Sequence, residues 1–315
     1  MPDKNLLKTV KEIKSLKIQG ASQVRRATIL AIKSIAEKSK AKNVEEFRRE
    51  LKKAMQLLAN ARPTEPETRN ALTVLLKTSM KNLPLSELKR EIARECDEFE
   101  EKRKKAMRRI AELGAEKLRH CPKIFTHCHS HTVEGILLEM HKRKSLEHVF
   151  LTETRPKFQG RITARNLARA GVPCTMIVDS AARSFIGKCD AFLTGADAII
   201  ANGAVINKIG TSQISLAAKK AGVPHYVATN SQAFDAATFF GAEEKIEERS
   251  KREVWSERLP KLEIRNPAFD ITEPELVKAI ICEKGVFPPD KFVRQMVREA
   301  ALEGKKFVSL IEMLR

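Results

Sequence analysis

The chain has 315 residues and a mass of 35.5 kDa, which is enough for two ordinary domains or one large one. Hydrophobic residues make up 42% and charged residues 31%, a composition that excludes a disordered chain. No apolar run approaches the roughly 20 residues that span a bilayer, and the first residues lack the apolar core of a signal peptide. We therefore expect a cytoplasmic protein that does not associate with membranes.

The charge is strongly positive and unevenly distributed. Residues 1–120 hold 30 Lys and Arg against 17 Asp and Glu, so they carry +13 of the net +19. A positive potential attracts phosphorylated small molecules and nucleic acids, and it is also typical of a solvated, Lys/Arg-rich helical surface. With one Trp and one Tyr, the chain has little material for stacking single-stranded bases, so nucleic acid is not the favoured partner.

The cysteines indicate reduced thiols. None of them forms a CxxC pair, which is the spacing of many redox and zinc sites. Two of them lie seven residues apart among four histidines, but this spacing fits no zinc-finger or zinc-ribbon pattern, so no metal is expected. The six cysteines are Cys96, Cys121, Cys128, Cys174, Cys189 and Cys282.

The first 120 residues have the periodicity of helices. Apolar residues recur at three- and four-residue steps, and the third segment stops before Pro63, because a residue that precedes proline avoids the α region. Ser86 is a candidate N-cap for the last and longest segment. We expect an N-terminal helical domain, residues 1–120, with helices over 6–16, 24–35, 44–59 and about 84–118.

After Cys121 short apolar runs alternate with helical stretches of 10 to 15 residues, which is typical of βαβ units and a parallel sheet. The predicted fold class is therefore α/β, with a Rossmann-like parallel sheet domain over residues 121–315. Glycine and small polar residues follow the strands, so the site is expected at the carboxyl edge of the sheet. No GxGxxG or Walker-type motif follows a strand. The predicted strands are 123–126, 148–152, 174–178, 191–194 and 225–228.

Two strand-end residues could exchange protons with a substrate. Cys128 follows the first predicted strand and precedes a helix, whose N-terminus would lower the pKa of the thiol, although a small buried core cysteine fits equally well. Asp197 follows the fourth predicted strand, where partial burial would raise the pKa of its carboxyl, although a turn or helix-cap aspartate is the plain alternative. A thiolate and a carboxylic acid at one sheet edge could together move a proton between carbons.

Several segments could bind phosphate. The segment 20–22 opens a helix, whose free backbone N–H groups suit an anion. Arg62 lies in a turn between helices, and Asn207 and Lys208 precede another helix start. Arg155 follows the second predicted strand, where it could hold a phosphate or pair with Glu153.

Together these segments resemble the archaeal ribose-1,5-bisphosphate isomerase family, which is grouped with methylthioribose-1-phosphate isomerase and the regulatory subunits of translation initiation factor 2B. The resemblance covers nearly the whole chain, including the QGAS and ARPT segments of the helical part. Its motifs are THCHS at 126–130, TETRPKFQGRITA at 152–164, VDSAAR at 178–183, GAD at 195–197, NGAVINKIGT at 202–211 and NPAFDIT at 266–272.

The resemblance implies an aldose–ketose isomerase, an intramolecular oxidoreductase that forms ribulose 1,5-bisphosphate in archaeal AMP salvage. Cys128 would be the proton acceptor and Asp197 the proton donor, with a cis-phosphoenolate between them and no cofactor. It also implies a homo-oligomer, from dimer to hexamer, and is compatible with AMP as an activator. The residues implied to contact substrate are Gln19, Gly20, Ala21, Ser22, Arg62, Ser130, His131, Thr132, Asn207 and Lys208.

Two departures from the family pattern leave alternatives open. Gln19 stands where the family has Arg, and Ala233 stands where it has Lys, so two cations that would face a bisphosphate are missing. Arg25, Arg26 and Arg183 are candidates to replace them. The alternatives are an isomerase for a sugar with one phosphate, such as methylthioribose 1-phosphate, and a non-catalytic initiation-factor-2B-like protein that binds a sugar phosphate or nucleotide.

Overall fold

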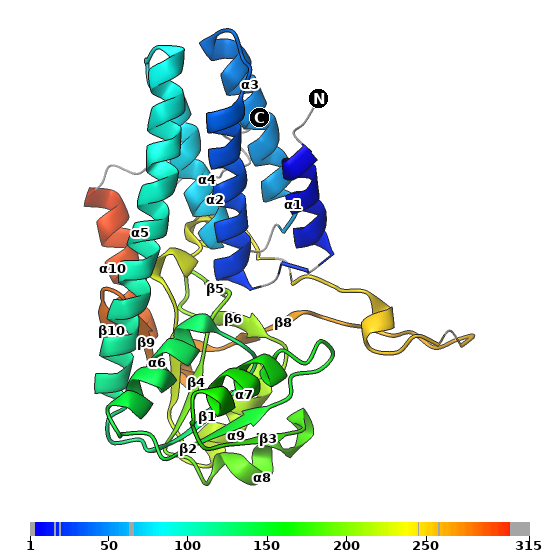
Figure 1. The fold of residues 1–315 in the computed structure, drawn as a ribbon. Coiled ribbons are helices and arrows are strands. Elements are labelled where there is room, and N and C mark those ends of the chain that lie inside the picture. The colour runs from blue at the N-terminus through cyan, green and yellow to red at the C-terminus, as the bar shows by residue number, and fades with distance from the viewer. Residues whose placement is uncertain are drawn as a thin grey trace. The chain divides into compact units, whose positions relative to one another are not determined.

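The structure is a computed structural model that describes residues 4–15, 17–18, 20–62, 66–244, 246–257 and 259–302. The chain divides into two compact units, one reaching Lys105 and the other beginning at Ala106. The division falls inside the longest helix, α5 (Leu85–Lys117), which therefore contributes residues to both units (Figure 1).

The first unit is a helical bundle with its own apolar core. Each helix buries residues at three- and four-residue spacing, and a single cluster of these side chains extends from Leu6 to Phe99. Besides the first part of α5, its helices are α1 (Lys4–Lys14), α2 (Ala21–Lys38), α3 (Val44–Ala59) and α4 (Pro66–Ser79). The prediction of a helical N-terminal part is confirmed, but it missed α4. Ser86 is not an N-cap, since Pro84 already accepts the first helical hydrogen bond from Leu88.

The second unit contains a seven-stranded sheet in the order β10-β9-β7-β4-β1-β2-β3. All neighbouring pairs are parallel except β9 and β10. Its strands are β1 (Lys123–Thr126), β2 (His148–Thr152), β3 (Cys174–Ile177), β4 (Ala191–Thr194), β7 (His225–Ala228), β9 (Ala279–Cys282) and β10 (Gly285–Phe287). The five predicted strands are confirmed with almost unchanged bounds, and β9 and β10 were not predicted.

Helices cover both faces of this sheet, as expected for a parallel α/β domain. Successive residues of β1 point to opposite faces: Ile124 packs in a cluster with α6, α7 and the end of α5, whereas Phe125 packs in a cluster with α8 and α9. The helices of this unit are α6 (His131–Lys142), α7 (Gly160–Arg169), α8 (Ala182–Ile186), α9 (Thr211–Lys220) and α10 (Pro289–Leu302). The predicted α/β class is confirmed.

A second, three-stranded antiparallel sheet lies in the same unit. It consists of β5 (Ala198–Ile199), β6 (Val205–Lys208) and β8 (Phe269–Thr272), in that order. Its register places Asn207 opposite Asp270, and so joins two segments that are about sixty residues apart. The sequence did not predict this sheet. Short 3-10 helices are η1 (Asp179–Ala181), η2 (Ser231–Ala233), η3 (Ala236–Phe240), η4 (Lys251–Glu253) and η5 (Pro274–Leu276).

Among the described residues, no helix combines the length and the apolar character that a membrane span requires.

Gly160, at the start of α7, allows this helix to approach the end of β2. A Cβ atom at this position would lie 1.8 Å from the carbonyl oxygen of Thr152, a backbone atom that cannot move aside. We expect Gly160→Ala to destabilise the second unit by about 3 kcal/mol in chemical denaturation followed by circular dichroism.

The matched control is Gly135→Ala in the middle of α6, where the nearest atom to a new Cβ is 3.8 Å away. This change should be neutral or stabilising by about 0.5–1 kcal/mol, because alanine favours the helix. Equal stability of the two variants would contradict the packing argument.

Candidate active site

Four adjacent parallel strands end at one edge, and each is followed by a polar residue that the site uses. Cys128 follows β1, Thr154 follows β2, Asp179 follows β3 and Asp197 follows β4. Cys128 has φ 70° and Thr154 has φ 63°, left-handed conformations that cost a non-glycine residue on the order of 1–3 kcal/mol. Such strain persists only where the surroundings hold it, and it is common at functional sites.

The loops that carry Cys128 and Asp197 are in direct contact. A Cβ atom on Gly195 would lie 2.8 Å from Oγ of Ser130, so only glycine lets the GAD segment approach this side chain. Ser130 is itself held in place, because its Oγ accepts a hydrogen bond from the Val133 N–H and caps α6. The N–H of Asp197 donates to the carbonyl of Ile206, which ties its loop to β6. The structure thus brings the two predicted catalytic residues onto touching loops.

The pKa of the Cys128 thiol differs from the value that the sequence led us to expect. Burial raises the pKa of the thiol to about 11, so the predicted lowering is wrong. The Lys208 ammonium and the His129 backbone N–H favour the thiolate, whereas the carboxylates of Asp197 and Asp179 oppose it. In the protein without ligand, the cost of desolvating a thiolate exceeds the help from these two donors.

Lys208 and Asn207 occupy fixed, buried positions on β6. Nζ of Lys208 donates to the carbonyl of Ala268 at 2.9 Å and lies 5.3 Å from the ring centroid of Phe269. The Asn207 amide donates to Oγ1 of Thr211 at 3.0 Å. Both side chains are predicted substrate contacts, and Lys208 is close enough to Cys128 to influence its thiol.

The start of α9 is not an open anion site. Oδ2 of Asp270 accepts hydrogen bonds from the N–H groups of Gly210 at 2.7 Å and Ser212 at 3.1 Å. Burial raises the pKa of this carboxyl to about 6, although the two amides and Lys208 counteract the rise. The expectation that this helix start would offer its N–H groups to phosphate is therefore corrected. A carboxylate from β8 already caps the helix.

The two other predicted contacts in this unit lie in the first turn of α6. His131 is exposed and Thr132 is half-buried. The ring of His131 packs edge-on against the ring of His129, with centroids 4.7 Å apart. His129 also forms a hydrogen bond with Thr163 of α7. The described residues contain no group of three or more His, Cys, Asp or Glu side chains arranged to hold a metal ion.

In the helical unit, the start of α2 has the features predicted for an anion site. Gly20 is its N-cap with φ 83°, and no side chain of this cap accepts from the first turn, which includes Ala21 and Ser22. Nη1 of Arg103, on α5, lies 3.4 Å from Oγ of Ser22. Sequence reasoning missed Arg103, because it stands in a run of charged residues and nothing in that pattern marks it. Arg62 is buried, and Gln19 lies outside the described residues.

The arginines named as replacements for the missing cations are engaged elsewhere or exposed. Arg25 is buried in an ion pair with Glu67 at 3.3 Å, and Arg26 pairs with Glu100 at 3.5 Å. Arg183 is exposed on α8. Arg103 also lies 3.5 Å from Glu100, so one carboxylate serves both α2 and α5 in this unit.

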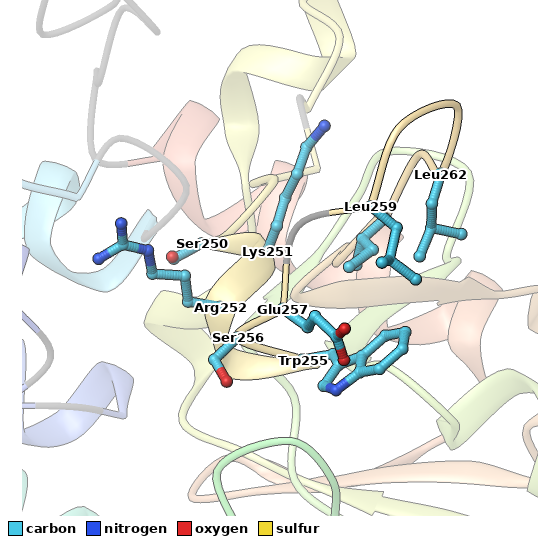
Figure 2. A pocket seen from close by; sticks show the side chains of 9 residues that line it. Ser250, Lys251, Arg252, Trp255, Ser256, Glu257, Leu259 and Leu262 are labelled. Atoms are coloured by element: carbon cyan, nitrogen blue, oxygen red, sulfur yellow. The ribbon is translucent and has the colours of Figure 1, made fainter.

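A pocket of about 480 Å³ lies in the segment around η4, away from the predicted residues (Figure 2). Trp255, Leu259 and Leu262 contribute apolar surface to it, and Lys251 and Arg252 also line it. This segment contacts the loop after β2, but not through a phosphate site. Arg155 donates to the carbonyl of Val254, and Glu153 pairs with Arg161 instead of Arg155.

Comparisons with known proteins agree with this architecture. The model of the Initiation factor 2 subunit family matches residues 17–289. Ribose 1,5-bisphosphate isomerase from Thermococcus kodakarensis is 40% identical over 295 residues, which cover 91% of this chain and 92% of that protein.

Two solved structures from Pyrococcus horikoshii have the same fold. A 5-methylthioribose 1-phosphate isomerase aligns with a TM-score of 0.79 and 31% identity, covering 93% of this chain and 88% of that one. A translation initiation factor 2B aligns with a TM-score of 0.80 and 25% identity, covering 92% of this chain and 99% of that one.

The fold is that of a group of similar proteins that includes sugar-phosphate isomerases and a translation factor. This chain belongs to the Initiation factor 2 subunit family, as its motifs predicted.

The influence of Lys208 on Cys128 can be measured directly. Because the ammonium stabilises the thiolate, Lys208→Met should raise the pH midpoint of Cys128 alkylation. Carbamidomethylation of the Cys128 peptide, followed by mass spectrometry between pH 7 and 12, gives this midpoint. Lys220→Met, at the exposed end of α9, should leave it unchanged. An identical midpoint in the Lys208 variant and the wild type would refute the coupling.

Proposed function

We propose that this protein is an aldose–ketose isomerase that converts ribose 1,5-bisphosphate to ribulose 1,5-bisphosphate. The observation that supports this proposal most directly is the position of Cys128 and Asp197 on two loops that touch at the carboxyl edge of the sheet. Lys208 lies close enough to influence the thiol. The relative from Thermococcus kodakarensis, a ribose 1,5-bisphosphate isomerase, supports the choice of substrate.

The proposed chemistry is a proton transfer along the sugar. After the ring opens, the thiolate of Cys128 takes the proton from C2, and the electron pair moves to form a cis-phosphoenolate. A proton is then delivered to C1 while the C2 hydroxyl loses its proton, which gives the C2 ketone. Asp197 carries protons between the sugar oxygens and carbons, including the proton that the ring oxygen gains when the ring opens. Lys208 stabilises the negative charge that develops at the thiolate and on the enolate. No metal or organic cofactor takes part.

Phosphate binding is proposed for both units. In the helical unit, the N–H groups at the start of α2 hold one phosphate, with Arg62 among its ligands. Arg103 supplies a guanidinium beside Ser22, and so compensates for the family arginine that is absent at Gln19. In the second unit, the proposed sugar-phosphate contacts are Ser130, His131, Thr132, Asn207 and Lys208.

The proposed substrate also implies a compartment, a pathway and an oligomeric state for the enzyme. The enzyme works in the cytoplasm in archaeal AMP salvage, as a homo-oligomer between dimer and hexamer, and AMP is a candidate activator.

A second candidate is an isomerase for a sugar that carries one phosphate, such as methylthioribose 1-phosphate. Ala233, which replaces the family lysine, is completely buried in η2. A lysine introduced here has to move its ammonium out of a packed position, so Ala233→Lys does not simply restore a ligand. The similar methylthioribose-phosphate isomerase structure agrees with this candidate.

A third candidate function is that of a non-catalytic, initiation-factor-like protein. The similar translation factor structure agrees with this third candidate.

The first test removes the two proton-transfer groups. Cys128→Ser and Asp197→Asn should each lower kcat by about 10²-fold or more, because each removes a group that exchanges protons with the substrate. Product is measured with ribose 1,5-bisphosphate and a coupled ribulose-bisphosphate carboxylase. Cys174→Ser, a half-buried cysteine on β3, is the matched control and should keep full activity. Full turnover in both site variants would refute the mechanism, and absence of product with the wild type would favour the other candidates.

The second test concerns Arg103. If its guanidinium contacts a phosphate, Arg103→Gln should raise KM for the bisphosphate by about tenfold, the value of one charge-assisted hydrogen bond, with a smaller change in kcat. Arg94→Gln is the control, because Arg94 lies on the same helix and pairs only with Glu91 and Glu98 in the described part of the chain. If both variants have the same KM as the wild type, Arg103 is not a phosphate ligand.

A further inference from the structure

Cys128 is held by hydrogen bonds at both of its peptide groups. Its N–H donates to Oγ1 of Thr154 at 2.9 Å, and its carbonyl accepts from Oγ1 of Thr163 at 3.1 Å. Both threonine side chains are almost completely buried, so water does not compete for these bonds. We call Thr154 and Thr163 the threonine clamp.

The direction of each hydrogen bond in the clamp can be assigned. Nε2 of His127 lies 2.9 Å from the carbonyl of Ile209, which can only accept, so this nitrogen carries the proton. Nδ1 of His127 is then the acceptor for the hydroxyl of Thr152 at 2.6 Å. Burial lowers the pKa of His127 to about 4, so the ring stays neutral and keeps this arrangement.

Thr154 completes this chain. The hydroxyl proton of Thr152 points to His127, so the hydroxyl of Thr154 can donate to Oγ1 of Thr152 at 3.4 Å or to the carbonyl of Thr152 at 3.5 Å. The oxygen of Thr154 is thereby oriented to receive the N–H of Cys128. The backbone of Thr154 is fixed as well, because its N–H donates to Oδ1 of Asp179 at 2.8 Å.

Thr163 binds the carbonyl group of Cys128, whereas Thr154 binds its N–H group. Its hydroxyl proton points to the carbonyl of Cys128, so Nδ1 of His129 has to be the donor in the 3.0 Å contact with Thr163. His127 and His129 therefore carry their protons on different nitrogens, and both serve hydroxyl groups that fix the backbone around Cys128.

We propose that the threonine clamp is a positioning device for the proton acceptor: Thr154 and Thr163 hold Cys128 in its left-handed conformation, which fixes where its side chain points from the end of β1. This inference rests on the proposed role of Cys128 and deepens it. Neither threonine touches the substrate. They act through the cysteine, because a relaxed φ at Cys128 would point its side chain in another direction and change the position of the sulfur relative to Lys208, which favours the thiolate.

The test replaces each hydroxyl by a methyl group of the same size. Thr154→Val and Thr163→Val should lower kcat by about 10-fold to 100-fold and change KM by less than about threefold, because geometry at the acceptor is lost and substrate contacts remain. The pH midpoint of Cys128 alkylation should rise in both variants, because the sulfur moves relative to Lys208, which favours the thiolate. Thr154→Ser, which keeps the hydroxyl, should restore both values to near those of the wild type.

Thr175→Val is the matched control. Thr175 also forms a hydroxyl–histidine hydrogen bond on this sheet, to His148 at 2.9 Å, but it lies on β3 and does not contact Cys128. It should leave kcat and the alkylation midpoint unchanged, and melting temperatures identify any variant that simply loses stability. The proposal is overturned if both valine variants keep the wild-type midpoint, or if Thr154→Ser behaves like Thr154→Val. The alkylation assay needs no substrate, so it tests the clamp even if the wild type yields no ribulose 1,5-bisphosphate.

Discussion

The parallel pairing of β1 with β2 on one side and β4 on the other is the constraint on which the candidate site depends. Its register aligns Thr126 with Leu151 and Leu193, so the three strands end at the same level. Cys128, Thr154 and Asp197 therefore emerge at one edge without any long-range adjustment. The glycines follow from the same constraint: Gly195 makes room for Ser130, and Gly160 lets α7 approach the end of β2.

This arrangement buries charge, and the buried charges explain the character of the site. Removing the Cys128 thiol from water works against its thiolate, while Lys208 and the His129 N–H favour it. The same Lys208 also lowers the pKa of Asp270, which burial raises. Because burial outweighs both of these groups, the surroundings favour the protonated thiol over the thiolate.

The family relationship fixes the fold more firmly than the substrate. Relatives with similar coverage include sugar-phosphate isomerases and a translation factor. The differences lie in the cations. Ala233 is buried where the family has lysine, and Arg103 approaches Ser22 from a helix that no motif singles out. Under the proposed function, the choice of substrate therefore depends on the proposed phosphate ligands and not on the proposed proton-transfer pair.

The sequence by itself determined five of the seven strands of the larger sheet, the α/β class and the position of Cys128 and Asp197 at strand ends. Apolar runs of four or five residues bounded by small polar residues are local signals. Two-residue β5 and the antiparallel pairing of β6 with β8 have no such signal. Only the tertiary structure decided that Asp270 caps α9, that burial outweighs the helix N-terminus at Cys128, and that two threonines hold its peptide groups. Each of these depends on contacts between residues 26 to 60 positions apart, and on the loss of water around them, which a local pattern does not contain.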